Sequence, residues 1–236
     1  MEKTIGNLIT SQKENPLVSN PSRLEAKING KEVSFTTKQL ELFWRNEFIN
    51  SMKLVSPQFT IDSSNKALIS SLYEYAWRHD GIFDPRKGLL FHGDMGVGKS
   101  TLLKGLQNFM GKINRYCFGL NNPYITFHLT SAAEISLLYA EKGIDGISRF
   151  TDRDKMGNLA IDEVGREPMD AKHYGTGINV IQTILQLRYE ERNLYFTHMT
   201  TNLDPNEDFS DIYGDYIADR VKEMFNVIKL EGRSRR

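Results

Sequence analysis

Residues 93 to 100 read Gly93-Asp94-Met95-Gly96-Val97-Gly98-Lys99-Ser100, which is a complete loop of the form G-x-x-x-x-G-K-[ST]. An apolar run at 88–92 precedes the loop and predicts a buried strand, and the pattern from residue 101 onward predicts a helix. The glycines let several backbone N–H groups converge on one phosphate, and the helix N-terminus adds partial positive charge there. The sequence therefore predicts a nucleotide site in an α/β P-loop fold.

The residues of this loop have distinct expected roles. The Lys99 ammonium reaches the β- and γ-phosphates of ATP, and the Ser100 hydroxyl is an expected ligand of Mg²⁺. The predicted nucleotide-binding residues are Gly93, Asp94, Met95, Gly96, Val97, Gly98, Lys99, Ser100 and Thr101.

Composition limits the possible functions. The chain has 236 residues and a formal net charge of zero, so any contact with nucleic acid requires a local basic patch. Its single cysteine, Cys117, excludes an internal disulfide and a zinc site built on several cysteines. No apolar run is long enough to span a bilayer, and the first residues do not resemble a signal peptide. We expect a cytoplasmic protein that does not bind membranes.

The N-terminal part differs in character from the rest of the chain. Residues 1 to about 35 are polar and predict a flexible arm, and a helix is predicted from Thr37 with a stripe that includes Trp44 and Phe48. The stripe packs in the core or docks a partner, and core packing is the favoured interpretation. We expect an N-terminal arm and helix over 1–56 and an ATPase domain over 57–236.

Strand and helix patterns alternate after the loop. Further strands are predicted at 124–129, 158–162, 194–200 and 226–230, with helices between them. This alternation is typical of a parallel sheet with helices on both faces. The third strand ends in Asp162-Glu163, and strand carboxyl ends line the ligand crevice in such sheets. We expect Asp162 to hold Mg²⁺ and Glu163 to act as the general base for an attacking water.

Together these segments resemble the DnaC/IstB branch of the AAA+ ATPases, which contains replicative helicase loaders and transposition helper ATPases. The resemblance covers roughly 65–236 and lies in the segments 88–103, 158–203 and 213–236. Its landmarks are Asp162-Glu163, Tyr174-Gly175, Arg188-Tyr189, Thr200-Thr201-Asn202-Leu203 and Asp219-Arg220-Val221. The resemblance implies a P-loop NTPase of the AAA+ type with a parallel five-stranded sheet, a short helical N-terminal extension and no C-terminal lid domain.

The resemblance also implies roles that composition does not give. Asn202 corresponds to the residue that orients the attacking water, and a turn residue at a strand end is its alternative. Arg220 corresponds to an arginine finger that reaches a neighbouring subunit, which implies a homo-oligomer, and a solvated helix arginine is its alternative. Arg235 or Arg236 is the candidate for a second sensor.

The implied function is that of a helicase loader that hydrolyses ATP with Mg²⁺. Its expected partners are a replicative helicase or a transposase and single- or double-stranded DNA. The alternatives are a transposition helper ATPase, a small-molecule kinase with a phosphate loop, or a nucleotide-gated binding module.

Overall fold

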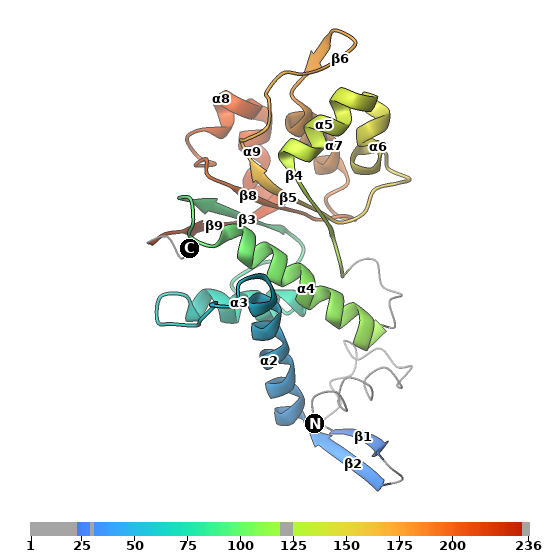
Figure 1. The fold of residues 1–236 in the computed structure, drawn as a ribbon, viewed down its shortest axis with the longest axis vertical. Helices are drawn as coiled ribbons and strands as arrows, with labels where there is room; N and C mark the ends of the chain where they lie inside the picture. The colour runs from blue at the N-terminus through green and yellow to red at the C-terminus, as the bar shows by residue number, and fades with distance from the viewer. Residues whose placement is uncertain (1–22, 29–30, 119–124, 233–236) are drawn as a thin grey trace. The chain divides into compact units, whose positions relative to one another are not determined.

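A computed structural model describes residues 23–28, 31–118 and 125–232 (Figure 1). The chain divides into two compact units. The helical unit comprises Met1–Gly81 and Lys104–Thr126, and the sheet unit comprises Ile82–Leu103 and Phe127–Arg236. The domain boundary expected after residue 56 stays a prediction, and the expected arm lies outside the described residues at 1–22 and 29–30. In the described part of the chain, no helix is both long and apolar enough to cross a membrane.

The helical unit begins with a β-hairpin that the sequence analysis did not predict. Strands β1 (Arg23–Ile28) and β2 (Lys31–Thr36) pair in antiparallel register. The expectation of a flexible arm is therefore wrong for these two segments. Apolar residues alternate along both strands, and the sequence Asn29-Gly30 between them is a dipeptide that favours hairpins, so the signal was local.

Three helices form the core of the helical unit. They are α2 (Thr37–Val55), α3 (Lys66–Ala76) and the part of α4 (Lys99–Phe118) from Lys104 onward. Helix α2 begins at Thr37, and a capping box starts it, with Thr36 as the N-cap and Gln39 as its partner.

The aromatic stripe of α2 packs inside this unit. Trp44 and Trp77 lie 5.2 Å apart between ring centroids, and Phe48 lies 4.9 Å from Phe109 of α4. Edge-to-face packing of this kind stabilises a core beyond the area it buries. The interpretation of the stripe as core packing agrees with this arrangement.

The sheet unit contains the predicted parallel sheet of five strands, in the order β4-β5-β8-β3-β9. The strands are β3 (Gly88–Gly93), β4 (His128–Ser131), β5 (Leu159–Val164), β8 (Thr197–Thr201) and β9 (Phe225–Leu230). The loop-bearing strand β3 lies between β8 and β9, and β5 lies on the other side of β8. The carboxyl ends of β3, β5 and β8 therefore meet at one edge.

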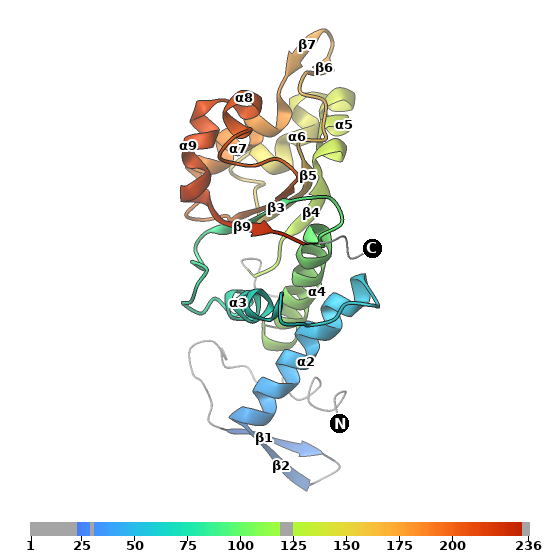
Figure 2. The ribbon, with the colours of Figure 1, turned by 90° about the vertical axis from the view of Figure 1, so that its left-hand side faces the viewer.

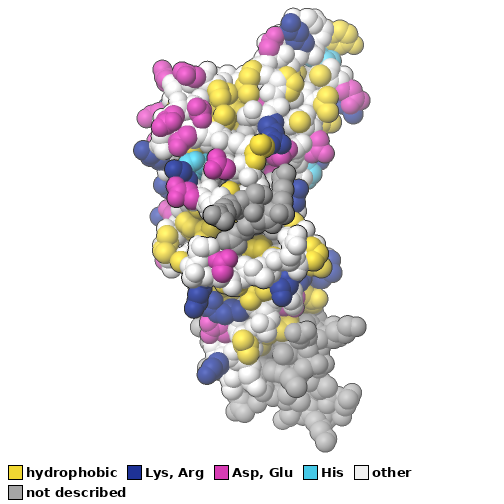
Figure 3. Space-filling model, turned by 60° about the vertical axis from the view of Figure 1, so that its left-hand side comes forward, with side chains coloured by type: hydrophobic (Ala, Val, Ile, Leu, Met, Phe, Trp, Pro, Cys, Tyr) yellow, Lys and Arg dark blue, Asp and Glu magenta, His cyan; other side chains and the backbone are white. Residues whose placement is uncertain are grey.

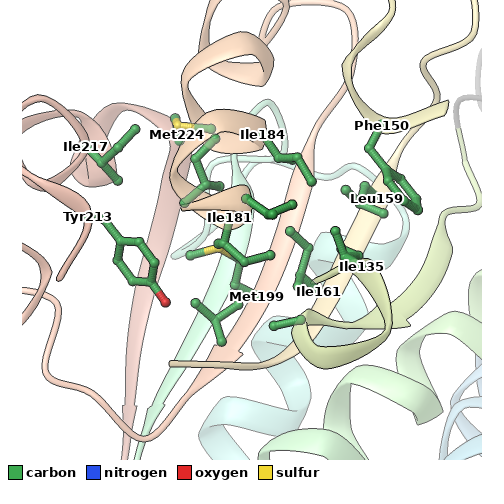
Figure 4. Close-up of a cluster of buried hydrophobic side chains, with 14 of the residues drawn as sticks. Ile135, Phe150, Leu159, Ile161, Ile181, Ile184, Met199, Tyr213, Ile217 and Met224 are labelled. Carbon is green, nitrogen blue, oxygen red and sulfur yellow. The ribbon is translucent and has the colours of Figure 1, made fainter. Parts of the chain in front are cut away.

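Helices cover one face of this sheet, as Figures 1 and 2 both show. They are α5 (Ala132–Lys142), α6 (Ile144–Thr151), α7 (Val180–Glu190), α8 (Phe209–Tyr213) and α9 (Asp215–Met224). Their apolar side chains meet those of β5 and β8 in one buried cluster (Figure 4). The sequence predicts helical structure between the strands at 194–200 and 226–230, and the structure has two short helices there, separated at Gly214, where φ is +81°. A short hairpin, β6 (Ala171–His173) with β7 (Thr176–Ile178), was also not predicted.

Candidate active site

The phosphate loop connects β3 directly to the N-terminus of α4. Gly93 ends the strand with φ +130°, and a Cβ atom there would lie 2.2 Å from the carbonyl oxygen of Leu230 in β9. Only glycine fits this close approach, because any side chain would push β9 away from β3. The loop then enters the helix at Lys99, so the first N–H groups of α4 face the space that the loop encloses.

The Lys99 side chain bridges the loop from within. It is 8% exposed, and its Nζ donates to the carbonyl oxygens of Gly93 at 2.6 Å and Asp94 at 2.7 Å. These bonds use two of the three N–H donors of the ammonium. Burial lowers the pKa of Lys99, and the nearby carboxylate of Asp94 acts in the opposite direction. A buried ammonium in this position fits a phosphate group, whose negative charge would stabilise it.

A chain of hydrogen bonds joins three neighbouring elements beside the loop. Ser100 Oγ at the start of α4 donates to Asp162 Oδ1 at 2.7 Å, and Thr200 Oγ1 in β8 donates to the same oxygen at 2.5 Å. The backbone N–H of Glu163 donates to Thr200 Oγ1 at 2.9 Å. Sequence reasoning named Thr200 only as part of a landmark of the resemblance and gave it no role in the site.

Ser100 and Asp162 present hard oxygen atoms that suit Mg²⁺. The described residues contain no cluster of three His, Cys, Asp or Glu side chains that would form a metal cage. A magnesium ion at this site would therefore share its coordination with phosphate oxygens and water, as this ion usually does.

Glu163 has an unusual backbone conformation. Its φ is +60°, and the register between β5 and β8 shifts between Ile161 and Val164. A left-handed conformation in a residue other than glycine costs on the order of 1–3 kcal/mol and occurs most often at functional sites. The irregularity turns the Glu163 side chain out of the sheet, where it is 46% exposed while Asp162 stays buried.

Arg166 holds the Glu163 carboxylate. Its NH1 donates to Glu163 Oε1 at 2.8 Å, and its NH2 lies 3.1 Å from Met95 Sδ in the phosphate loop. Sequence reasoning missed Arg166, because nothing in its local pattern separates it from an ordinary surface arginine.

The structure does not bring Asn202 into the hydrogen-bonded network of the site. Asn202 is exposed and follows β8 directly. The neighbouring Thr201 forms the buried contacts instead, donating to the Val164 carbonyl at 2.7 Å and accepting from the Leu203 N–H at 3.0 Å. The role of Asn202 in orienting water stays a prediction.

Arg220 lies on α9 and contacts residues of α7 and α9. Its guanidinium lies 3.5 Å from the ring centroid of Tyr216 and 4.9 Å from that of Tyr189. NH1 donates to the Tyr216 carbonyl at 3.2 Å, and Nε is buried with no hydrogen-bond partner among the described residues. The side chain is thus preorganised, and none of these contacts is with the phosphate loop of its own chain. The candidate sensors Arg235 and Arg236 lie outside the described residues.

These features define a P-loop site at the carboxyl edge of a parallel sheet, and comparisons with solved structures agree on the fold. The chain is similar to DnaI, with 23% identity and a TM-score of 0.53 over 77% of this chain and 89% of that chain. It is similar to the DnaC helicase loader, with 17% identity and a TM-score of 0.50 over 75% of this chain and 96% of that chain. No protein-family model matches the chain, and no curated protein matches it in sequence.

A third similar structure is the replication initiator DnaA bound to AMPPCP and single-stranded DNA, with 15% identity and a TM-score of 0.50. That match covers 75% of this chain and 49% of that chain. At such identities the likeness shows the fold. The chain therefore has the α/β P-loop fold of the DnaC-like AAA+ proteins, and the resemblance predicted from sequence is confirmed at this level.

Proposed function

We propose that this protein is an AAA+ ATPase that hydrolyses ATP. The observation that carries the proposal is the bonded chain Ser100–Asp162–Thr200, with Glu163 beside it at the mouth of the phosphate loop. Lys99 holds the phosphates, and Ser100 and Asp162 would hold Mg²⁺, which would supply charge neutralisation. Glu163 takes a proton from water as the water oxygen bonds to the γ-phosphorus and the bond to the ADP oxygen breaks.

We further propose that the active form is a homo-oligomer. In it, Arg220 of one subunit stabilises charge on the γ-phosphate of its neighbour, and Asn202 orients the attacking water. The support is that the described contacts of Arg220 are with Tyr189, Tyr216 and Asp219 of α7 and α9 rather than with its own loop.

The cellular role that we propose is the loading of a replicative helicase onto single-stranded DNA in the cytoplasm. One support is the fold that the chain shares with the DnaC helicase loader. The other is that the sequence segments containing the phosphate loop, Asp162-Glu163 and Arg220 occur in the order that the resemblance implies. Acidic side chains gather along α8 and α9 (Figure 3), which disfavours contact with DNA phosphates there. They include Glu207, Asp208, Asp211, Asp215, Asp219 and Glu223.

The test of this role uses the full chain and the replicative helicase of the same cell. Unwinding of an oligonucleotide annealed to single-stranded circular DNA is measured with ATP, with and without the protein. A loader is expected to raise the unwinding rate and to lose this effect in Lys99→Ala. If unwinding does not change but the protein stimulates strand transfer by a transposase, the chain is a transposition helper.

Thr200→Val is expected to slow ATP hydrolysis about 10-fold. The part-buried Glu163 N–H then lacks its acceptor and Asp162 loses a donor, a loss of about 1–3 kcal/mol. Valine keeps the shape of threonine, so ADP affinity stays close to that of the parent. Turnover and ADP titration measure the two quantities. Thr201→Val is the matched control, because it removes a buried hydroxyl that donates to the Val164 carbonyl and not to the Asp162 carboxylate. Equal slowing in both variants would contradict the role of Thr200.

Arg220→Ala is expected to bind ATP like the parent and to fail to hydrolyse it. Mixing this variant with Lys99→Ala restores activity if Arg220 acts in trans, because one interface then joins an intact arginine to an intact loop. Hydrolysis is measured against the mole fraction of the two variants, with DNA present. If the mixture is shown to be oligomeric and hydrolysis stays at the baseline at every mole fraction, Arg220 does not act in the site of a neighbouring subunit.

A further inference from the structure

Arg166 connects the two halves of the candidate site. It lies in the turn that follows β5, three residues after Glu163, and its two terminal nitrogens point to different partners. NH1 binds the carboxylate of the proposed general base, and NH2 contacts Met95 at the tip of the phosphate loop. One guanidinium thus touches both the carboxylate of the proposed general base and the loop that is built to receive phosphates.

Arg166 and Glu163 form a half-exposed ion pair, so either side chain can readily take another partner. The two side chains are 44% and 46% exposed, and ion pairs with such exposure contribute little to stability. A Glu163 oxygen that already accepts from a guanidinium is also less available to take a proton from water. As the structure stands, the general base is therefore restrained.

A γ-phosphate entering the loop would offer Arg166 a stronger partner than Glu163. The planar guanidinium binds phosphate oxygens through two parallel hydrogen bonds, and a phosphate carries more negative charge than one carboxylate. Lys99 already uses two of its three N–H donors on loop carbonyls. The positive charge of Arg166 also contributes to the lowered pKa of Lys99, after burial, which is the larger cause.

We propose that Arg166 distinguishes ATP from ADP. Its guanidinium leaves the Glu163 carboxylate for the γ-phosphate, and this exchange frees Glu163 to act as the base. The inference rests on the proposed function, since it concerns the same nucleotide site. In ADP, which lacks the γ-phosphate, Arg166 stays on Glu163 and the base stays restrained.

The test is a comparison of nucleotide affinities by titration calorimetry with Mg²⁺, using AMPPCP as the ATP analogue and ADP. Arg166→Ala is expected to weaken AMPPCP binding about 10-fold, the size of a lost charge-assisted hydrogen bond, and to change ADP binding less than about 2-fold. The matched control is Arg153→Ala, which removes an exposed arginine that pairs with Glu191 away from the nucleotide site. It is expected to change neither affinity.

The outcomes separate this inference from the proposed function. If both nucleotides bind the parent and Arg166→Ala leaves the ratio of the two affinities unchanged, Arg166 is an ordinary surface ion pair and the inference fails alone. If neither nucleotide binds the parent, the proposed function fails and the inference fails with it. Thermal unfolding without nucleotide shows that Arg166→Ala is folded, which we expect because the side chain is half-exposed.

Discussion

Lys99→Ala is expected to abolish measurable nucleotide binding, a weakening of about 100-fold or more, because each charge-assisted hydrogen bond contributes about 1.5–3 kcal/mol. The ammonium both meets the phosphates and holds the loop through the Gly93 and Asp94 carbonyls. Alanine removes the cation and this bridge together. Equilibrium titration with ATP and ADP measures the effect.

The control for this prediction is Lys104→Ala, which removes an exposed lysine further along the same helix. It is expected to bind both nucleotides like the parent. Circular dichroism then establishes that Lys99→Ala is folded. Unchanged ATP affinity in a folded Lys99→Ala protein would show that the phosphate-loop assignment is wrong.

The second large effect is expected from Glu163→Gln, which should bind ATP at least as tightly as the parent and hydrolyse it ~10²–10⁴-fold more slowly. Glutamine has the same size as glutamate and cannot take a proton from water. The backbone at this position is left-handed in the parent and remains so, since the constraint comes from the strand register and the bond to Thr200. Single-turnover hydrolysis and ATP titration measure the two quantities.

A matched control is Glu191→Gln, which weakens an Arg–Glu pair at a site that bonds neither the loop nor Asp162. Its turnover is expected to equal that of the parent. If Glu163→Gln turns over within a few-fold of the parent, the general base lies elsewhere. If it binds ATP poorly, Glu163 contributes to binding rather than to the chemical step.

Much of the fold was predictable because its signals are local. The phosphate loop, the apolar run before it and the helix after it are adjacent in sequence. The strand that carries Asp162-Glu163 is likewise recognisable from its own residues. The signal of the unpredicted hairpin β1–β2 was also local, since apolar and polar residues alternate on both sides of the sequence Asn29-Gly30. The break at Gly214 shows the limit of such reasoning, because periodicity alone does not separate one helix from two short ones.

The candidate site was predictable in its residue types and not in its connections. Lys99, Ser100 and Asp162 follow from motif and strand order, and their proximity needed only a parallel sheet. The roles of Thr200 and Arg166 could not be predicted from the motif or the strand order. Thr200 bonds a residue 38 positions away, and Arg166 reaches across 71 positions to Met95. The packing of Arg220 on Tyr189 and Tyr216 likewise depends on how α7 lies against α9.

The sequence by itself therefore determined the class of fold and the chemistry of the loop, because glycine spacing and hydrophobic period act within a few residues. Only the tertiary structure decided the strand order β4-β5-β8-β3-β9 and, with it, which side chains share the site. It also decided that Glu163 adopts φ +60° and is held by Arg166. The physical reason is that lateral strand order and side-chain pairing are set by packing between distant segments, which no local pattern records.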